Sequence, residues 1–120
     1  MRTSTSDVVL RGKVINGFEA DLPNLIWLPD LFEHAENFEC FFTRPENKVR
    51  KVRNVHLLNH RNFGTSDHHE SFIMEDMVED VMRYMDDKNM TMATIGGHGF
   101  GAKVATVAAS MNLDRFTGVM

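Results

Sequence analysis

The sequence predicts an α/β protein, a three-layer sandwich in which helices cover both faces of a mostly parallel sheet. Short apolar runs of strand length alternate with segments of helical period, which is typical of βαβ units. The runs are almost wholly apolar, as expected for parallel strands that are buried on both faces. The expected strands are Val8–Leu10, Leu25–Leu28, Val55–Leu58, Met90–Ile95 and Phe116–Met120.

The clearest expected helix runs from Ser71 to Asp87, with Ser71 as its N-cap. Six apolar side chains share one face of this helix and six polar ones take the other. The apolar face holds Met74, Met77, Val78, Val81, Met82 and Met85, and the polar face holds Glu75, Asp76, Glu79, Asp80, Arg83 and Asp86. We interpret the methionines as core packing rather than as a binding groove.

Two further helices are expected. Residues Phe100–Met111 are rich in alanine, which lets a backbone pack closely against a sheet, and Asn112 is a plausible stop. A weaker apolar pattern predicts a helix over Glu33–Phe42, bounded by Pro45.

Composition excludes several classes of protein. The chain has 120 residues, 42% hydrophobic and 25% charged, as in one ordinary globular domain. A formal net charge of -4 offers no electrostatic footprint for nucleic acid or an anionic membrane. No apolar run approaches the length of a membrane span. We therefore expect no nucleic-acid partner and no membrane span.

The single cysteine, Cys40, cannot form an internal disulfide or a zinc pattern, which favours a reducing, intracellular compartment. The opening stretch, Met1–Ser6, has a weak organelle-targeting composition. We expect a mitochondrial protein if that stretch is a leader and a cytoplasmic one otherwise. Cys40 itself is expected to be a buried small hydrophobe rather than a nucleophile.

A basic stretch precedes the expected strand at Val55, and an acidic helix follows it. Two interpretations remain open: the segments face each other on a solvated surface, or the basic stretch is a docking patch for a partner. The basic residues are Arg44, Lys48, Arg50, Lys51 and Arg53.

The most informative stretch, Met92–Ala105, passes from an apolar strand through a glycine-rich turn directly into a helix. Such turns either bind phosphate or present a nucleophile on a strained corner. Lys103 is followed by Val104, so the hydroxyl of a P-loop is missing, and the glycine spacing does not fit a dinucleotide loop. The pattern Gly97-His98-Gly99-Phe100-Gly101 instead matches the nucleophile elbow G-x-S-x-G, except that glycine replaces the serine.

From Leu25 onward the chain resembles the α/β-hydrolase family, especially its small esterase-like members. Leu25–Phe38 is similar to the family's strand that ends in His-Gly, and Val55–His68 to its Asp-x-Arg-x-x-Gly-x-Ser strand end. Met74–Val81 and Gly97–Ala105 look like the next helix and the elbow, in family order. The resemblance implies a truncated α/β-hydrolase-like domain over residues 1–120. Residues 1–24 would be the edge-strand segment and 25–120 the βαβ core.

Three departures from the family bear on function. Gly99 stands where the family has its serine, and glycine cannot form an acyl-enzyme. Pro29-Asp30 replaces His-Gly, which places a carboxylate in the loop that would stabilise an oxyanion with the Phe100 N–H. The family's acid and histidine follow the strand near Phe116 and have no counterpart. Without a catalytic demand, glycine relieves the strain of the elbow.

His60, His68, His69 and His98 all lie near expected carboxyl ends of strands, which suggests a metal site. No pair has a recognised ligand spacing, so we expect no metal and no other cofactor.

Three functional classes remain. The first is a catalytically inactive α/β-hydrolase-like protein that acts as an accessory subunit of a larger complex. The others are the N-terminal part of a split or truncated esterase-like hydrolase, and a small-molecule binder that keeps the family's pocket. In the first class, the Phe116–Met120 edge and the adjacent flank of helix Phe100–Met111 would contact other protein subunits, because an open strand edge invites pairing.

Overall fold

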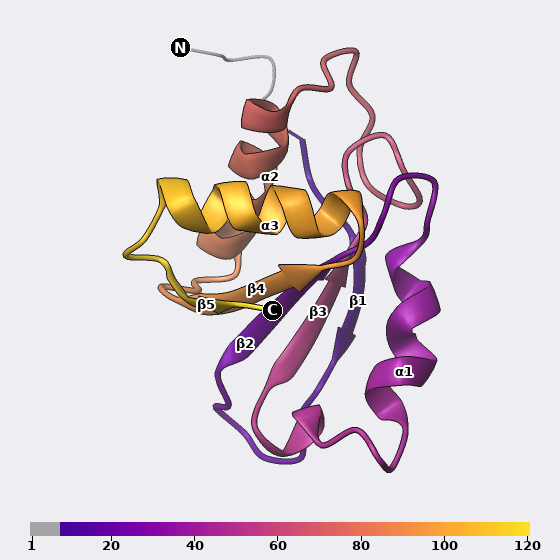
Figure 1. The fold of residues 1–120 in the computed structure, drawn as a ribbon, viewed down its shortest axis with the longest axis vertical. Coiled ribbons are helices and arrows are strands. Elements are labelled where there is room, and N and C mark those ends of the chain that lie inside the picture. Colours follow the sequence, from indigo (N-terminus) through magenta and orange to yellow (C-terminus); the bar gives the residue numbers. More distant parts are fainter. Residues whose placement is uncertain (1–7) are drawn as a thin grey trace.

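Five strands form one sheet in the order β1–β3–β2–β4–β5 in a computed structural model that describes residues 8–120 (Figure 1). Their bounds are Gly12–Ile15 for β1, Asn24–Leu28 for β2, Asn54–Leu58 for β3, Ala93–Gly97 for β4 and Phe116–Val119 for β5. Only the pairing of β1 with β3 is antiparallel, and the other three pairings are parallel. The prediction of a mostly parallel sheet is confirmed.

Helices cover both faces of this sheet. A 3-10 turn, Ala35–Phe38, leads into α1, Glu39–Thr43, and a second 3-10 turn spans Val49–Lys51. The helices α2, Met74–Asp87, and α3, Phe100–Met111, lie on the opposite face from α1 (Figure 1). Two apolar clusters fill the two interfaces, one on the α2 and α3 side and one on the α1 side. No helix within residues 8–120 is long and apolar enough to cross a bilayer.

The N-terminal strand prediction was wrong in position. Residues 8–10 are not in a strand, and β1 begins at Gly12. Val8 and Leu10 are buried in the α2 and α3 cluster, while the Val9 backbone bonds to Asp67. Residues 8–10 are therefore apolar because two of their side chains are buried, and not because they pair in the sheet. The proposed targeting stretch, Met1–Ser6, lies outside the described residues.

Two details of the α2 prediction were also wrong. The helix begins at Met74 with Ile73 as its N-cap, and the Ser71 hydroxyl instead donates to the Asp76 carboxylate. Asp76 and Asp80, assigned to the solvent face, are both 1% exposed. The weaker helix prediction over Glu33–Phe42 becomes the 3-10 turn and the short α1, whereas α3 has its expected bounds.

The basic stretch and the acidic helix do not face each other. Residues 44–53 lie around α1 and the second 3-10 turn, on the far side of the sheet from α2 (Figure 1). No ion pair joins the two segments among the described residues. The basic stretch and α2 pack on opposite faces of the sheet, so their charges are separated although the two segments are near each other in sequence.

The parallel register brings the candidate site together. Leu28 of β2 pairs with Gly97 of β4, and Trp27 pairs with Leu57 of β3. The loops that follow β2, β3 and β4 therefore leave the sheet together, at the carboxyl ends of these parallel strands and near the N-terminus of α3.

Candidate functional site

The glycine-rich turn after β4 forms a tight elbow. Gly99 has φ 58° and ψ -121°, a conformation that side chains rarely adopt, and its carbonyl accepts the first backbone bonds of α3. The His98 N–H donates to the Leu28 carbonyl at 3.0 Å, which ties the elbow to β2. At Gly101 a Cβ would collide with the Leu28 and Pro29 carbonyls. The strained corner that the sequence places at Gly99 is present, as its positive φ shows.

The Asp30 carboxylate lies against this elbow. Its Oδ1 accepts the Phe100 N–H at 2.8 Å and the Leu31 N–H at 2.9 Å. A Cβ on Gly99 would overlap the Asp30 carboxyl group. The Asp30 carboxyl group thus takes the space that a side chain on residue 99 would need. It also accepts both of the backbone N–H groups that converge there.

These contacts keep Asp30 ionised. The Phe100 N–H, followed by the Leu31 N–H, lowers the pKa of Asp30 below its usual value, and His98 and His60 act in the same direction. Desolvation opposes the shift, and its influence on the pKa is smaller than that of the two backbone hydrogen bonds. The sequence predicted a carboxylate in this loop, and the structure adds that a single oxygen takes both N–H groups.

Glu33 connects the Asp30 loop to the elbow. One Glu33 oxygen, Oε1, accepts the Asp30 N–H at 2.8 Å and lies 3.1 Å from His98 Nδ1. The His98 side chain is 57% exposed. On the buried side, His60 Nε2 donates to the Pro29 carbonyl at 2.8 Å, and burial lowers the pKa of His60. The loop is thus held from both sides.

Aromatic rings surround the outer part of the elbow. Phe32 contacts Phe63 at a ring-centroid distance of 5.5 Å, and Phe63 contacts Phe72 at 5.9 Å. Phe72 stacks on Phe100 at 6.5 Å, so the arc of rings ends at the residue whose N–H binds Asp30. Phe32 is 87% exposed. Sequence analysis did not identify this arc, because its members are far apart along the chain.

The suggested histidine cluster does not form. His60 is buried against Pro29, His98 lies at Glu33, and the His69 Nδ1 accepts the Ser71 N–H. No group of three or more potential metal ligands lies together in the described part of the chain. Cys40, expected to be buried, is exposed on α1, so that expectation was wrong.

A buried ion network that the sequence analysis missed anchors the loop after β3. Arg61 is fully buried and donates from Nε and Nη2 to the two Asp80 oxygens, each at 2.7 Å. Its Nη1 donates to the Ser71 carbonyl and lies 3.9 Å from Asp76. The four-residue spacing of Asp76 and Asp80 was a usable signal, because it places both on one helix flank.

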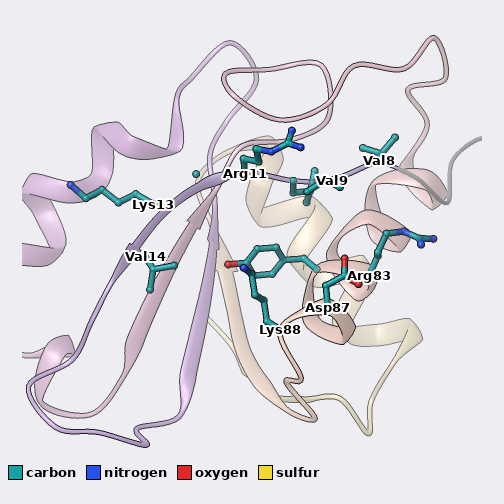
Figure 2. A pocket seen from close by; sticks show the side chains of 11 residues that line it. Val8, Val9, Arg11, Lys13, Val14, Arg83, Asp87 and Lys88 are labelled. Carbon is teal, nitrogen blue, oxygen red and sulfur yellow. The ribbon is translucent and has the colours of Figure 1, made fainter.

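A separate cavity of about 430 Å³ lies between the outer side of β1 and the C-terminal half of α2 (Figure 2). Val9, Val14 and Tyr84 supply apolar lining, and Arg83, Asp87 and Lys88 supply charge. Lys13 points toward α1, where it pairs with Glu39 (Figure 2). No residue of the elbow lines this cavity, so it is distinct from the Asp30 site.

Comparison with known proteins gives matches only among solved structures. No protein-family model and no curated protein matches the sequence. A marine microorganism esterase is 23% identical, with a TM-score of 0.82 over 94% of this chain and 41% of the esterase. The enol-lactonase from Burkholderia xenovorans LB400 is 19% identical, with a TM-score of 0.79 over 92% of this chain and 41% of its own.

A third match is MGS-M2, an alpha/beta hydrolase enzyme from a Medee basin deep-sea metagenome library. It is 13% identical, with a TM-score of 0.79 over 94% of this chain and 40% of its own. The chain thus spans about two fifths of the length of these structures. The strand order, the elbow at the end of β4 and these superpositions agree, and the protein has part of the α/β-hydrolase fold.

Proposed function

We propose that this protein is catalytically inactive as an acyl hydrolase and acts as a structural or accessory subunit of a protein complex. One observation carries the proposal: Asp30 Oδ1 accepts the Phe100 and Leu31 N–H groups, and the Phe100 N–H is a donor that the family resemblance assigns to a substrate oxyanion. A carbonyl substrate would have to displace a fixed negative charge. Gly99 offers no side chain for attack.

The assembly role is supported by surfaces at the β5 end of the sheet. Val119 and Met120 are 50% and 62% exposed, and Met111 and Leu113 at the end of α3 are 60% and 79% exposed. These apolar side chains lie next to a strand that pairs on one side only among the described residues. Such a combination is typical of protein–protein contacts.

The test of inactivity uses the purified protein with a fluorophosphonate probe and a p-nitrophenyl ester, beside an active serine esterase. We expect no labelling and no hydrolysis above a heat-denatured sample. Stoichiometric labelling within residues 97–101 would show that the elbow is catalytic and overturn the proposal.

A second candidate is the N-terminal part of a split or longer esterase-like or lipase-like hydrolase. Coverage of about two fifths of the matched structures supports it, whereas Gly99 and Asp30 count against it. The mass of the native protein distinguishes the two. A subunit migrates near 13.7 kDa under denaturing conditions, and a longer hydrolase is larger.

A further inference from the structure

We propose that residues 44–53, together with Phe18, form a docking surface for an acidic segment of a partner protein. This basic surface carries five cations, Arg44, Lys48, Arg50, Lys51 and Arg53. The inference rests on the accessory role proposed above and adds to it the chemistry of one partner. Its support comes from the position of the surface, its unpaired charge and the apolar side chains beside the cations.

The basic surface lies at the end of the sheet where β2 and β3 begin, away from the elbow (Figure 1). The turn that follows β1 lies beside it, because the Phe18 N–H donates to the Arg50 carbonyl at 2.9 Å. The Asn54 N–H at the start of β3 donates to the Pro23 carbonyl at the end of the same turn. The surface is therefore separate from the Asp30 site.

The cations of the basic surface have no recorded carboxylate partner. None of the five takes part in an ion pair within residues 8–120, and neither does Glu46 in the same stretch. By contrast, Arg11, Lys13 and Arg115 each pair with a carboxylate. The acidic helix α2 cannot neutralise the surface, since it lies on the other face of the sheet (Figure 1). The five charges are thus available to an external anion.

Charge is unevenly distributed along the chain. Residues 44–53 hold five of the thirteen Lys and Arg residues but only one of the seventeen Asp and Glu residues, a formal charge of +4 in a chain of net charge -4. The neighbouring turn adds Glu19 and Asp21, so the cationic area is short. A long polyanion or a flat anionic bilayer would extend onto acidic parts of the molecule and be repelled. A short acidic segment fits within the surface.

Arg50 is already oriented for binding. Its Nε donates to the Asn16 carbonyl at 2.9 Å, and its guanidinium carbon lies 4.6 Å from the centroid of the Phe18 ring. Neither Nη atom takes part in a hydrogen bond recorded within residues 8–120. A guanidinium that is held by stacking and one hydrogen bond, with both Nη groups free, is suited to bind a carboxylate.

Apolar side chains lie among these cations. Phe18, Phe41 and Val52 are 64%, 53% and 52% exposed. Phe41 also lines a hollow of about 450 Å³ together with Arg44 and Lys48. A partner segment that carries a leucine or phenylalanine would bury that side chain here while its carboxylates pair with the cations. We therefore expect a segment that is acidic and has at least one large apolar side chain.

The experiment measures binding of the full chain to a fluorescein-labelled short peptide of glutamate and aspartate that carries two leucines. Fluorescence anisotropy is the readout. One control peptide has glutamine and asparagine in place of the acids, and another has serine in place of the leucines. We expect the acidic leucine peptide to bind most tightly. Raising NaCl from about 0.05 M to about 0.5 M should weaken it, because salt screens exposed charges.

Lys48→Gln/Lys51→Gln should weaken binding of the acidic leucine peptide by about fivefold to tenfold. The matched control, Lys88→Gln/Lys103→Gln, removes the same charge from two exposed lysines outside the basic surface. It should change the affinity by less than about twofold, since distant charges are screened. Phe41→Ser should weaken the leucine peptide more than the serine peptide, because only the former uses the hollow.

Three results would each overturn the inference: no binding of the acidic peptide at low salt, equal binding of the uncharged peptide, or equal weakening by the two double variants. Tighter binding of a single-stranded RNA oligomer or of phosphatidylserine vesicles, lost in Lys48→Gln/Lys51→Gln, would also overturn it by assigning the surface to another class of partner. Ester hydrolysis reports on the elbow and not on these residues. Hydrolysis with peptide binding retained would therefore overturn only the proposed inactivity, and loss of peptide binding without hydrolysis only this inference.

Discussion

At the scale of single residues, Gly99 and Asp30 are sterically coupled. The Asp30 carboxyl lies where a Cβ on residue 99 would be, so a side chain at one position excludes this placement of the other. The absence of a serine and the presence of a carboxylate are therefore not independent departures. Each makes the other compatible with the fold.

Gly99→Ser tests this coupling. The serine would meet both a positive φ and the Asp30 carboxyl, and we expect a loss of about 1–3 kcal/mol in the free energy of unfolding. We also expect no ester hydrolysis, because the displaced Asp30 carboxylate stays in the loop beside the Phe100 N–H, where its negative charge opposes a developing oxyanion. Urea denaturation and a p-nitrophenyl ester assay measure the two effects.

The control for that substitution is Gly118→Ala in β5, where an added Cβ meets nothing within 4 Å. It should change the free energy of unfolding by no more than about 0.5 kcal/mol. In an Asp30→Gly background, Gly99→Ser should cost less than in the wild type, because the collision is removed. Equal costs in both backgrounds would show that the two positions are not coupled.

His56 gives stability a dependence on pH. Burial, with a smaller influence from Lys88, lowers the pKa of His56 to about 4, and its Nδ1 lies 2.7 Å from the Tyr84 hydroxyl. In the unfolded chain, the His56 imidazole has its ordinary pKa of 6.5. The folded state therefore favours the neutral imidazole of His56, and the stability that is present above pH 6.5 is lost as the pH falls toward 4.

We expect His56 to contribute about 2–3 kcal/mol to this loss, as read from urea unfolding at pH 7 and pH 4.5. His60 acts in the same direction, because burial also lowers its pKa. The Asp30 and Asp67 carboxylates have lowered pKa values, and they reduce stability only below their ordinary pKa of 3.8. His56→Asn should flatten the profile, whereas the exposed change His68→Asn should leave its slope unchanged.

At the scale of elements, Arg61 joins the loop after β3 to α2. Arg61→Met leaves Asp80 and Asp76 buried without this guanidinium, and we expect a loss of about 3–5 kcal/mol in the free energy of unfolding. Lys13→Met is the matched control, because the Lys13–Glu39 pair is exposed and such pairs contribute about 0–1 kcal/mol. Similar losses in both variants, measured by urea denaturation, would contradict the structural role of Arg61.

The same elements show how far sequence reasoning reaches. Four of the five strands and the bounds of α3 were predictable, because parallel strands are apolar throughout and glycine marks the elbow. The strand at residues 8–10 was wrong, since packing against α2 and strand pairing both require apolar residues. Asp76 and Asp80 were misplaced because a buried carboxylate cannot be told from an exposed one until its Arg61 partner is known.

The candidate site was likewise predictable only in part from the sequence. Its position and the Pro29-Asp30 loop were readable from the order of the motifs. The convergence of the Phe100 and Leu31 N–H groups on one Asp30 oxygen was not, because it depends on a side-chain rotamer across a gap of 70 residues in sequence. The aromatic arc needed three separate loops to be placed in space.

At the scale of the whole molecule, the sheet formed by residues 8–120 has β1 as its outer strand on one side and β5 on the other (Figure 1). Both end strands pair with one neighbour only among the described residues. They differ in what lies beside them. Phe116 of β5, which we expected to be open, is buried at 8% exposure, so the apolar surface there comes from Val119, Met120 and the end of α3.

We predict that the β5 edge and the adjoining end of α3 are buried against another polypeptide, either a second copy or a different subunit. An open edge that carries apolar side chains favours pairing, and a lysine on such an edge opposes it because pairing would desolvate the charge. Val119→Lys should therefore reduce the assembled fraction in light scattering and raise hydrogen exchange across β5. Val14→Lys, at 44% exposure on the β1 edge, is the matched control and should leave assembly unchanged. Three results together would refute this prediction: the wild-type chain stays monomeric at high concentration, it binds no partner in cell extract, and its β5 amides exchange rapidly. A loss of assembly with Val14→Lys alone would move the interface to the opposite edge.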